Sequence, residues 1–293
     1  MATTEVLRAP PAPTPAPVGD AVAGVQLVRP QAEQKPKRAK RIPRQVRRLI
    51  GPVLALGVWQ LVCSLGVFNS VEVASPIAVV DAGRQLWAQG ELQANLLISL
   101  QRVAEGLVLG VSAGTALAVI SGLFHLGEDL VDPVIQAARS VPILGLVPLA
   151  IIWFGVGETP KVFLIALGCT FPVYLNTYAA IRGVDSKLVE AGQTFGLGRW
   201  GLVRRVILPG ALPGFLVGLR FALVSSWLIV VVAEVINAKS GIGYLINEAQ
   251  SWNRTDIIML GLVIYAVLGL IADGIVRLLE HRLLTWRRGF TGS

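Results

Sequence analysis

The sequence predicts an all-α membrane protein with six transmembrane helices, and three observations support that prediction. Hydrophobic residues make up 54% of the 293 positions and charged residues only 15%, a balance that soluble domains seldom have. Six apolar runs are long enough to cross a bilayer, which takes roughly 17 to 25 residues. Basic residues gather in three clusters that an even number of crossings brings to one side of the membrane.

The six apolar runs are expected to form the spanning helices. They cover residues 49–68, 103–124, 141–157, 162–181, 211–236 and 257–276. Residues 69–102 mix polar and apolar side chains, which favours amphipathic helices at the outer membrane surface. Arg102 and Glu105 leave the start of the second helix open over several residues.

The basic clusters predict the orientation. They lie at 35–48, 182–205 and 277–288, so both termini and the loop 183–210 are expected in the cytoplasm. The carboxylates Glu128, Asp129 and Asp132 fall on the same side, but acidic residues count little in this rule.

The chain is expected to divide into a tail, 1–48, a transmembrane domain, 49–288, and a short C-terminal end, 289–293. The tail is Pro-rich over its first 34 residues, which predicts disorder, and then basic. It carries ten Lys/Arg against three Asp/Glu, and the remaining chain sixteen against fifteen. All but one unit of the net charge of +8 therefore lies in the tail, where the basic run is expected to anchor the chain to lipid headgroups. A long extension precedes the first apolar run, so no cleavable signal is expected. Without interleaved aromatic residues, no nucleic-acid partner is expected either.

Residues that could support catalysis or bind a metal are sparse. Cys63 and Cys169 lie in apolar segments without a CxxC spacing or a nearby histidine, and His125 and His281 are isolated. No disulfide, metal site or bound cofactor is therefore expected. A membrane-embedded enzyme would need converging polar groups, whereas the charged residues within the predicted spans lie at mismatched depths.

Charges and prolines inside the predicted spans are candidates for function. Arg220 and Asp273 lie at similar depths from the cytoplasmic side, so they are expected to pair, with a structural or a transport role. Glu234 can face a path or gate, or can pair with Lys239. The third span contains two prolines, at positions 142 and 148. Pro142 and Pro148 predict that this helix is interrupted or kinked. The kink can line a cavity, or it can have no function.

Small residues recur every four positions in two spans, which lets another helix approach closely in a membrane. The ridges are Gly106, Gly110, Gly114, Ala118 and Gly122 in the second span, and Gly210, Gly214, Gly218 and Ala222 in the fifth.

The loop 183–210 has the most distinctive pattern. Asp185 or Ser186 can cap a short helix, and Gly196 can end it in a left-handed turn. A second amphipathic helix with Arg199, Arg204 and Arg205 is then expected to stop at Pro209. This pair of helices exposes Glu190 on the cytoplasmic side.

At this loop the chain resembles the permease subunits of bacterial binding-protein-dependent ABC importers. Their signature is Glu-Ala-Ala, three residues, Gly, nine residues, and Ile-x-Leu-Pro. The matching positions here are Glu190, Ala191, Gly192, Gly196, Val206, Leu208 and Pro209. Gly192 and Val206 depart from the pattern but keep the small size or the apolar character.

The resemblance extends over about residues 49–288. The segments RSVPILGLVPLAIIWFG, KVFLIALGCTFPVYLNT and AKSGIGYLI look like the branch that handles aliphatic sulfonates, near taurine, nitrate and bicarbonate relatives. It implies a type I ABC importer permease bundle in the bacterial inner membrane, with the loop helix as the ATPase-coupling helix.

The implied partners are a second copy of the chain, two cytoplasmic ATPase subunits and a periplasmic substrate-binding protein. ATP and magnesium are expected on the ATPase, because none of the six lysines lies in a phosphate-binding GxxxxGK[ST] loop. The alternatives are the same role for taurine, nitrate or bicarbonate and, more remotely, an enzyme or a channel.

Overall fold

The computed structural model describes residues 44–66, 69 and 72–284, apart from the side chains of residues 44–49 and 237. The chain divides into two compact units, residues 1–49 and 50–293, and the second contains α2 and every later helix. Most of the predicted tail 1–48 and the end 289–293 lie outside the described residues.

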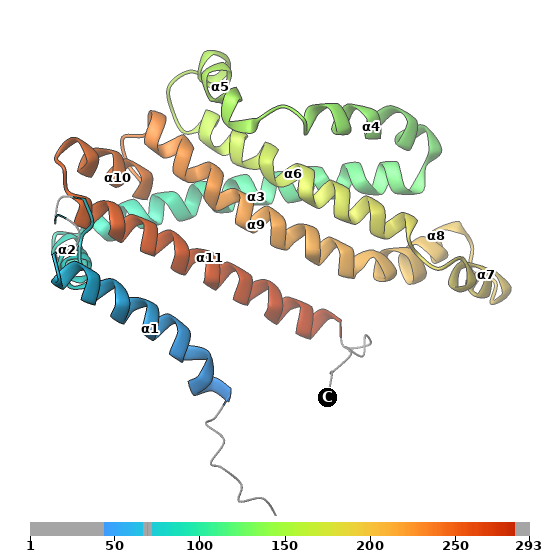
Figure 1. Cartoon of the computed structure of the whole chain (residues 1–293). Helices are drawn as coiled ribbons and strands as arrows, with labels where there is room; N and C mark the ends of the chain where they lie inside the picture. Colours follow the sequence, from blue (N-terminus) through green and yellow to red (C-terminus); the bar gives the residue numbers. More distant parts are fainter. Residues whose placement is uncertain (1–43, 67–68, 70–71, 285–293) are drawn as a thin grey trace, which may run out of the picture. The chain divides into compact units, whose positions relative to one another are not determined.

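All regular structure in the described part is helical (Figure 1). The helices are α1 (Arg44–Ser64), α2 (Pro76–Ala88), α3 (Glu91–Leu123), α4 (His125–Ala138), η1 (Ile143–Leu146), α5 (Val147–Phe154), α6 (Thr159–Arg182), α7 (Ser186–Thr194), α8 (Arg199–Leu202), η2 (Val203–Ile207), α9 (Leu208–Asn237), α10 (Ile242–Ser251) and α11 (Thr255–Leu283).

Four helices in the described part are long and apolar enough to cross a membrane. They are α3, α6, the run from α8 through α9, and α11. The bent pair formed by α4 and η1–α5 gives up to five. The described apolar part of α1, Ile50–Ser64, is shorter. The all-helical membrane architecture is confirmed, but six spanning helices are not.

The predicted third span, 141–157, is wrong as a continuous helix. Its residues form the 3₁₀ turn η1 and the eight-residue helix α5, and α4 precedes them at a bend of 84°. Pro142 precedes η1 in an extended conformation and Pro148 lies in the first turn of α5, so the predicted interruption is present. The sequence reading missed α4 because Glu128, Asp129 and Asp132 made this helix resemble a polar loop.

Two further predicted helix ends are wrong. The helix α3 begins at Glu91, twelve residues before the predicted Val103, and it carries Arg102 buried within it. Pro209 does not stop the second loop helix, since it lies near the start of α9, just after the turn η2. The π-helical turn η2 joins α8 to α9, so one helical run covers Arg199–Ile236.

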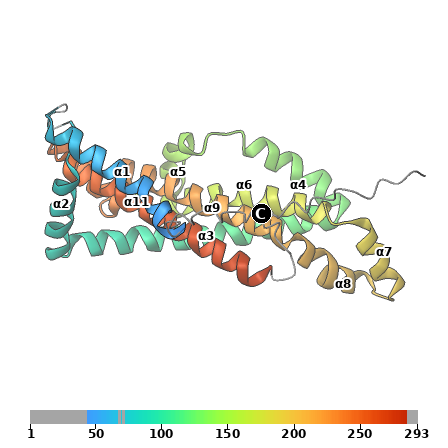
Figure 2. The same cartoon turned by 60° about the horizontal axis from the view of Figure 1, so that its bottom comes forward.

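Helix α6 packs between α3 and α9 and forms the centre of the bundle (Figures 1 and 2). Both predicted small-residue ridges face it. A Cβ added at Gly110 would lie 2.4 Å from the Ala166 carbonyl oxygen, and one at Gly214 would lie 2.3 Å from the Ala180 Cβ. Ala118 and Ala222 have no exposed surface. The three helices are therefore held together by van der Waals contact between closely approaching backbones, because the hydrophobic effect does not drive helix association within a membrane.

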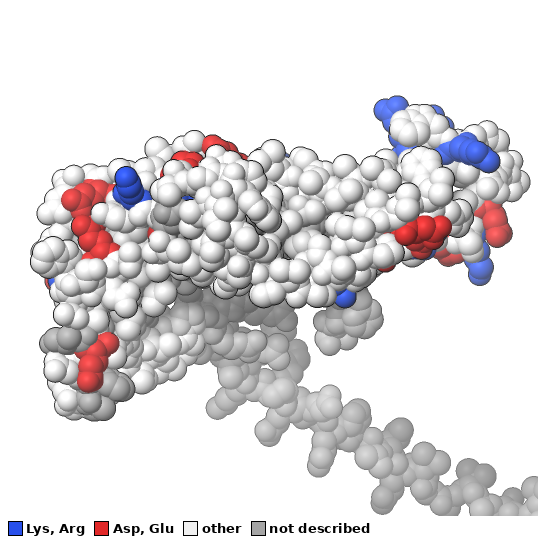
Figure 3. All heavy atoms as spheres, turned by 90° about the horizontal axis from the view of Figure 1, so that it is seen from above, with Lys and Arg blue, Asp and Glu red and all other residues white. Residues whose placement is uncertain are grey.

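Charged side chains gather toward the two ends of the bundle. On the face that Figure 3 shows, most Asp, Glu, Lys and Arg side chains lie toward the ends and the middle is almost uncharged. One end carries α2, α5 and α10, and the other carries α7 and α8 (Figures 1 and 2). The end with α2, α5 and α10 is called the α10 end, and the end with α7 and α8 is called the α7 end. An uncharged middle band is what a bilayer core requires.

Replacing Gly110 by Ala should weaken the contact between α3 and α6. The new methyl group would have to displace the α6 backbone, and such overpacking costs about 1–3 kcal/mol. For a chain of this size each kcal/mol corresponds to roughly 2–4 °C in Tm, so thermal unfolding of the purified protein should show a loss of several degrees.

Gly269→Ala is the matched control, since a Cβ at Gly269 meets no atom within 4 Å. Its Tm should be unchanged or slightly raised. Equal melting temperatures for the two variants would contradict the packing role of the α3 ridge.

Candidate functional sites

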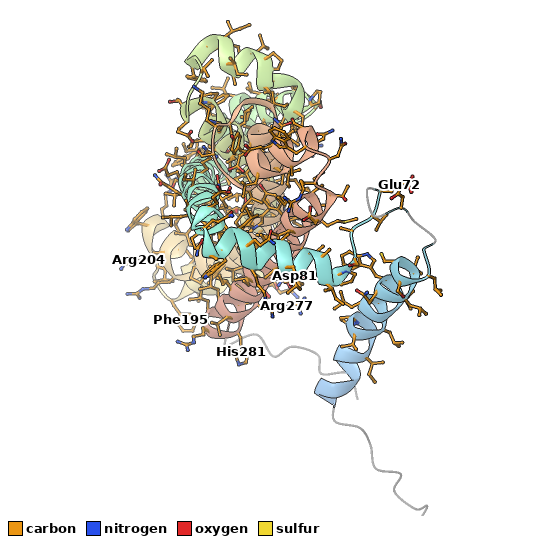
Figure 4. The ribbon with its side chains drawn as sticks, turned by 90° about the vertical axis from the view of Figure 1, so that its left-hand side faces the viewer. Glu72, Asp81, Phe195, Arg204, Arg277 and His281 are labelled. Atoms are coloured by element: carbon orange, nitrogen blue, oxygen red, sulfur yellow. The ribbon has the colours of Figure 1, made fainter. Side chains whose placement is uncertain are left out.

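The loop between α6 and α9 forms a compact helical projection at the α7 end. Asp185 caps α7 by accepting a hydrogen bond from the Lys187 N–H at 2.9 Å. Glu190 and Ala191 are exposed, and Phe195 is 88% exposed. Phe195 and Arg204 project away from the other helices (Figure 4). This surface has apolar and charged groups that no other part of the described residues covers.

The end of α7 depends on Gly196, whose φ is +78°. The Leu197 N–H donates to the Gly192 carbonyl at 3.0 Å, and the Gly196 N–H donates to the Gln193 carbonyl at 2.9 Å. This is the Schellman arrangement, which favours glycine at the left-handed position. The turn fixes the direction in which α8 leaves α7.

Gly192 and Val206 are the two positions at which the loop departs from the family pattern. Gly192 is buried, and a Cβ there would lie 2.7 Å from Leu202 Cδ2. Glycine therefore permits close contact between α7 and α8. Val206 and Pro209 are partly buried, and Leu208 is 40% exposed.

Arg220 and Asp273 come together between α9 and α11. Arg220 Nε lies 3.3 Å from Asp273 Oδ1 as an ion pair without a hydrogen bond. Arg220 Nη2 donates to Glu280 Oε2 at 2.7 Å, and Arg277 Nε donates to Asp273 Oδ2 at 2.7 Å. Two arginines and two carboxylates thus balance each other, and Glu280 is a partner that the sequence analysis missed.

Glu234 is the most deeply buried charged side chain of the described part, with no exposed surface. Its carboxylate accepts hydrogen bonds from Arg102 Nη1 at 2.7 Å, the Ser99 hydroxyl at 2.8 Å and the Gly243 N–H at 2.8 Å. The Tyr265 hydroxyl donates at 3.2 Å. Its cationic partner is Arg102, not the Lys239 considered from sequence. Glu234 thereby joins α3, α9, α10 and α11.

The start of α10 folds over this carboxylate. The Gly241 N–H donates to Asn95 Oδ1 at 2.6 Å and the Ile242 N–H to Ser99 Oγ at 2.9 Å, so side chains of α3 satisfy backbone groups that a helix start leaves free. Gly241 has a φ of +113°, and a Cβ there would lie 2.5 Å from the Glu234 carboxylate. Only glycine fits this position.

Arg102 also binds a second carboxylate, Glu158, in the turn before α6. Arg102 Nη2 donates to Glu158 Oε1 at 2.8 Å, and Arg102 Nε donates to Glu158 Oε2. Lys161 Nζ donates to Glu158 Oε1 at 3.1 Å. The hydrogen bonds from Arg102 and, to a smaller extent, Lys161 lower the pKa of Glu158 to about 2, although partial burial acts in the opposite direction.

Sequence reasoning missed most of this cluster. Ser99, Arg102, Glu158 and Tyr265 are far apart in the sequence and belong to no recognised spacing. The available signal was a charge near the edge of an apolar run, Arg102, together with two unpaired carboxylates, Glu158 and Glu234. Among the described residues, no three His, Cys, Asp or Glu side chains form a set that could hold a metal ion.

Comparison with known proteins identifies one family. Residues 106–285 match the binding-protein-dependent transport system inner membrane component. The SsuC protein of Escherichia coli, named as an aliphatic sulfonates transport permease, is 46% identical over 82% of this chain and 91% of its own length. The protein of the same name from Bacillus subtilis is 40% identical over 84% of this chain and 90% of its own length.

Among solved structures, an amino acid ABC transporter crystallised with histidines shares the fold. Its TM-score is 0.58 at 20% identity, and the match covers 68% of this chain and 97% of that chain.

Replacing Glu234 by Gln should destabilise the protein strongly. Removing one partner from a buried ion pair costs about 3–5 kcal/mol, because Arg102 then loses the charge of its buried partner. Tyr265→Phe removes a single hydrogen bond to a charged group and should cost only about 1.5–3 kcal/mol. Thermal unfolding should therefore rank the wild type above Tyr265→Phe and Tyr265→Phe above Glu234→Gln. A Glu234→Gln variant as stable as the wild type would contradict the stabilising role of the Arg102–Glu234 ion pair.

Proposed function

Since the chain belongs to the family of binding-protein-dependent transport system inner membrane components, we propose that it forms the membrane path of an ATP-driven importer for aliphatic sulfonates. The observation that carries the substrate assignment is the 40–46% identity to two permeases named for these anions. The chain is a transport permease, and we expect ATP hydrolysis on a separate subunit.

We assign α7 as the helix that couples the permease to its ATPase. It lies on a loop with exposed Glu190 and Ala191, and the exposed Phe195 follows it. In a protein interface the core is apolar and the rim is polar. The exposed Phe195 suits such a core, and the charged side chains beside it suit the rim. The basic residues 199, 204 and 205 then lie on the cytoplasmic side, as the positive-inside rule favours.

The connections of α7 suit transmission of a force. Only residues 183–185 separate it from α6. On its other side, α8 continues without a break into α9 through residue 236. A displacement of α7 therefore acts on two helices that pack closely together, and alternating access follows as a rigid-body movement of the bundle.

The assembly we propose contains two copies of this chain, two ATPase subunits and a periplasmic binding protein in the inner membrane, with both termini in the cytoplasm. In this orientation the α10 end faces the periplasm. The α4–α5 segment carries exposed apolar side chains such as Leu126, Leu130 and Ile152, and these face the second copy or lipid.

Uptake of labelled ethanesulfonate tests the substrate. Cells that lack the chain should regain ATP-dependent uptake when it is restored, and unlabelled alkanesulfonates should compete better than taurine or nitrate. An intact ATPase complex that restores no sulfonate uptake would contradict the substrate assignment but not the family.

Glu190→Lys should abolish uptake while the protein stays folded in the membrane, because it reverses a charge on the helix that contacts the ATPase. Asp81→Lys makes the same change on α2, at the opposite end of the bundle, and should leave copurification of the ATPase intact. Normal copurification and uptake with Glu190→Lys would refute the assignment of α7.

A further inference from the structure

We propose that Arg102 and Lys161 form an anion-binding site that Glu158 covers in this structure, and that the sulfonate group of the incoming substrate replaces the Glu158 carboxylate there. This inference rests on the proposed function, since it names the first contact between substrate and permease.

The two cations are buried while the carboxylate that covers them is accessible. The Arg102 and Lys161 side chains are 3% and 5% exposed, and the Glu158 side chain is 59% exposed. Buried cations without a nearby negative charge are unfavourable, so Arg102 and Lys161 need an anion at this place. Because Glu158 is already exposed, this carboxylate can leave at a smaller cost than the buried Glu234.

Arg102 is held in position without Glu158. Its Nη1 donates to Glu234 Oε1 and to the Ser240 carbonyl, both at 2.7 Å. Lys161 Nζ likewise donates to the Gly157 carbonyl at 2.9 Å. The edge of the guanidinium formed by Nε and Nη2 is the part that faces Glu158. Two parallel N–H groups of this kind bind any oxyanion that presents two oxygen atoms, and a sulfonate does so.

The turn that carries Glu158 is open to its surroundings. Cβ atoms added at Gly155 or Gly157 would meet nothing within 4 Å, so no packed neighbour encloses the turn at these two positions. Glu158 precedes the first residue of α6, but its side chain makes no capping hydrogen bond to the helix. Its carboxylate can therefore withdraw without unwinding α6.

The charge balance specifies a monoanion. Arg102 and Lys161 carry two positive charges, and Glu158 and Glu234 carry two negative ones. Withdrawal of Glu158 leaves one excess positive charge, which the single negative charge of a sulfonate neutralises. The site lies at the α10 end, which faces the periplasm in the proposed orientation.

Binding of labelled ethanesulfonate to the complete permease–ATPase complex in nanodiscs, without the binding protein, tests the site. Glu158→Gln removes the competing charge and should raise the affinity at least tenfold over the wild type. Glu158→Asp keeps the charge and should bind as weakly as the wild type. The double variant Glu158→Gln/Lys161→Met should lose the gain, and Asp81→Asn controls for the loss of an exposed carboxylate elsewhere.

Equal affinities for the wild type and Glu158→Gln, or a gain that survives Lys161→Met, would overturn the proposal. An effect of Glu158→Gln that appears only when the binding protein is added would also overturn it and assign the cations to an acidic side chain of that protein. Uptake by the unmodified importer decides the proposed function separately, since it does not depend on how tightly the Glu158 variants bind.

Discussion

The burial of one carboxylate, that of Glu234, constrains the whole α10 end of the bundle. A charged group without exposed surface persists only when hydrogen bonds and an opposite charge replace water. Arg102, Ser99, Tyr265 and the Gly243 N–H provide these partners and come from three different helices. Each of those helices is thereby fixed in register against α9.

The close packing of α3, α6 and α9 connects this end to the α7 end. Glycine ridges bring backbones into contact, which leaves little room for independent sliding of the three helices. The same helices carry or adjoin the charged groups at the α10 end: Arg102 lies on α3, Glu234 lies on α9, and Glu158 directly precedes α6. In the coupling that we propose, a force applied to α7 would therefore reach Arg102, Glu158 and Glu234 through these packed helices.

The local features of the loop 183–210 could be predicted from sequence because their causes are local. A capping Asp185 and a left-handed Gly196 act within one helical turn, and both appear as expected. The ridges were also predictable, since a spacing of four residues places glycines on one helix face. Pro209 was wrongly expected to end a helix, because the helical run here continues through the proline, directly after the π-helical turn η2.

The all-helical membrane class, the small-residue ridges and the caps of the loop 183–210 follow from the sequence alone, because periodicity, length and turn chemistry depend on neighbouring residues. Apart from the pair of Arg220 and Asp273, the pairing of the buried charges depends on the tertiary structure. Arg102, Glu158, Glu234 and Tyr265 belong to four separate segments, and Glu280 joins Arg220 from another helix. Whether a charge can enter the membrane depends on a partner across the bundle, which explains why α3 begins at Glu91 even though it carries Arg102.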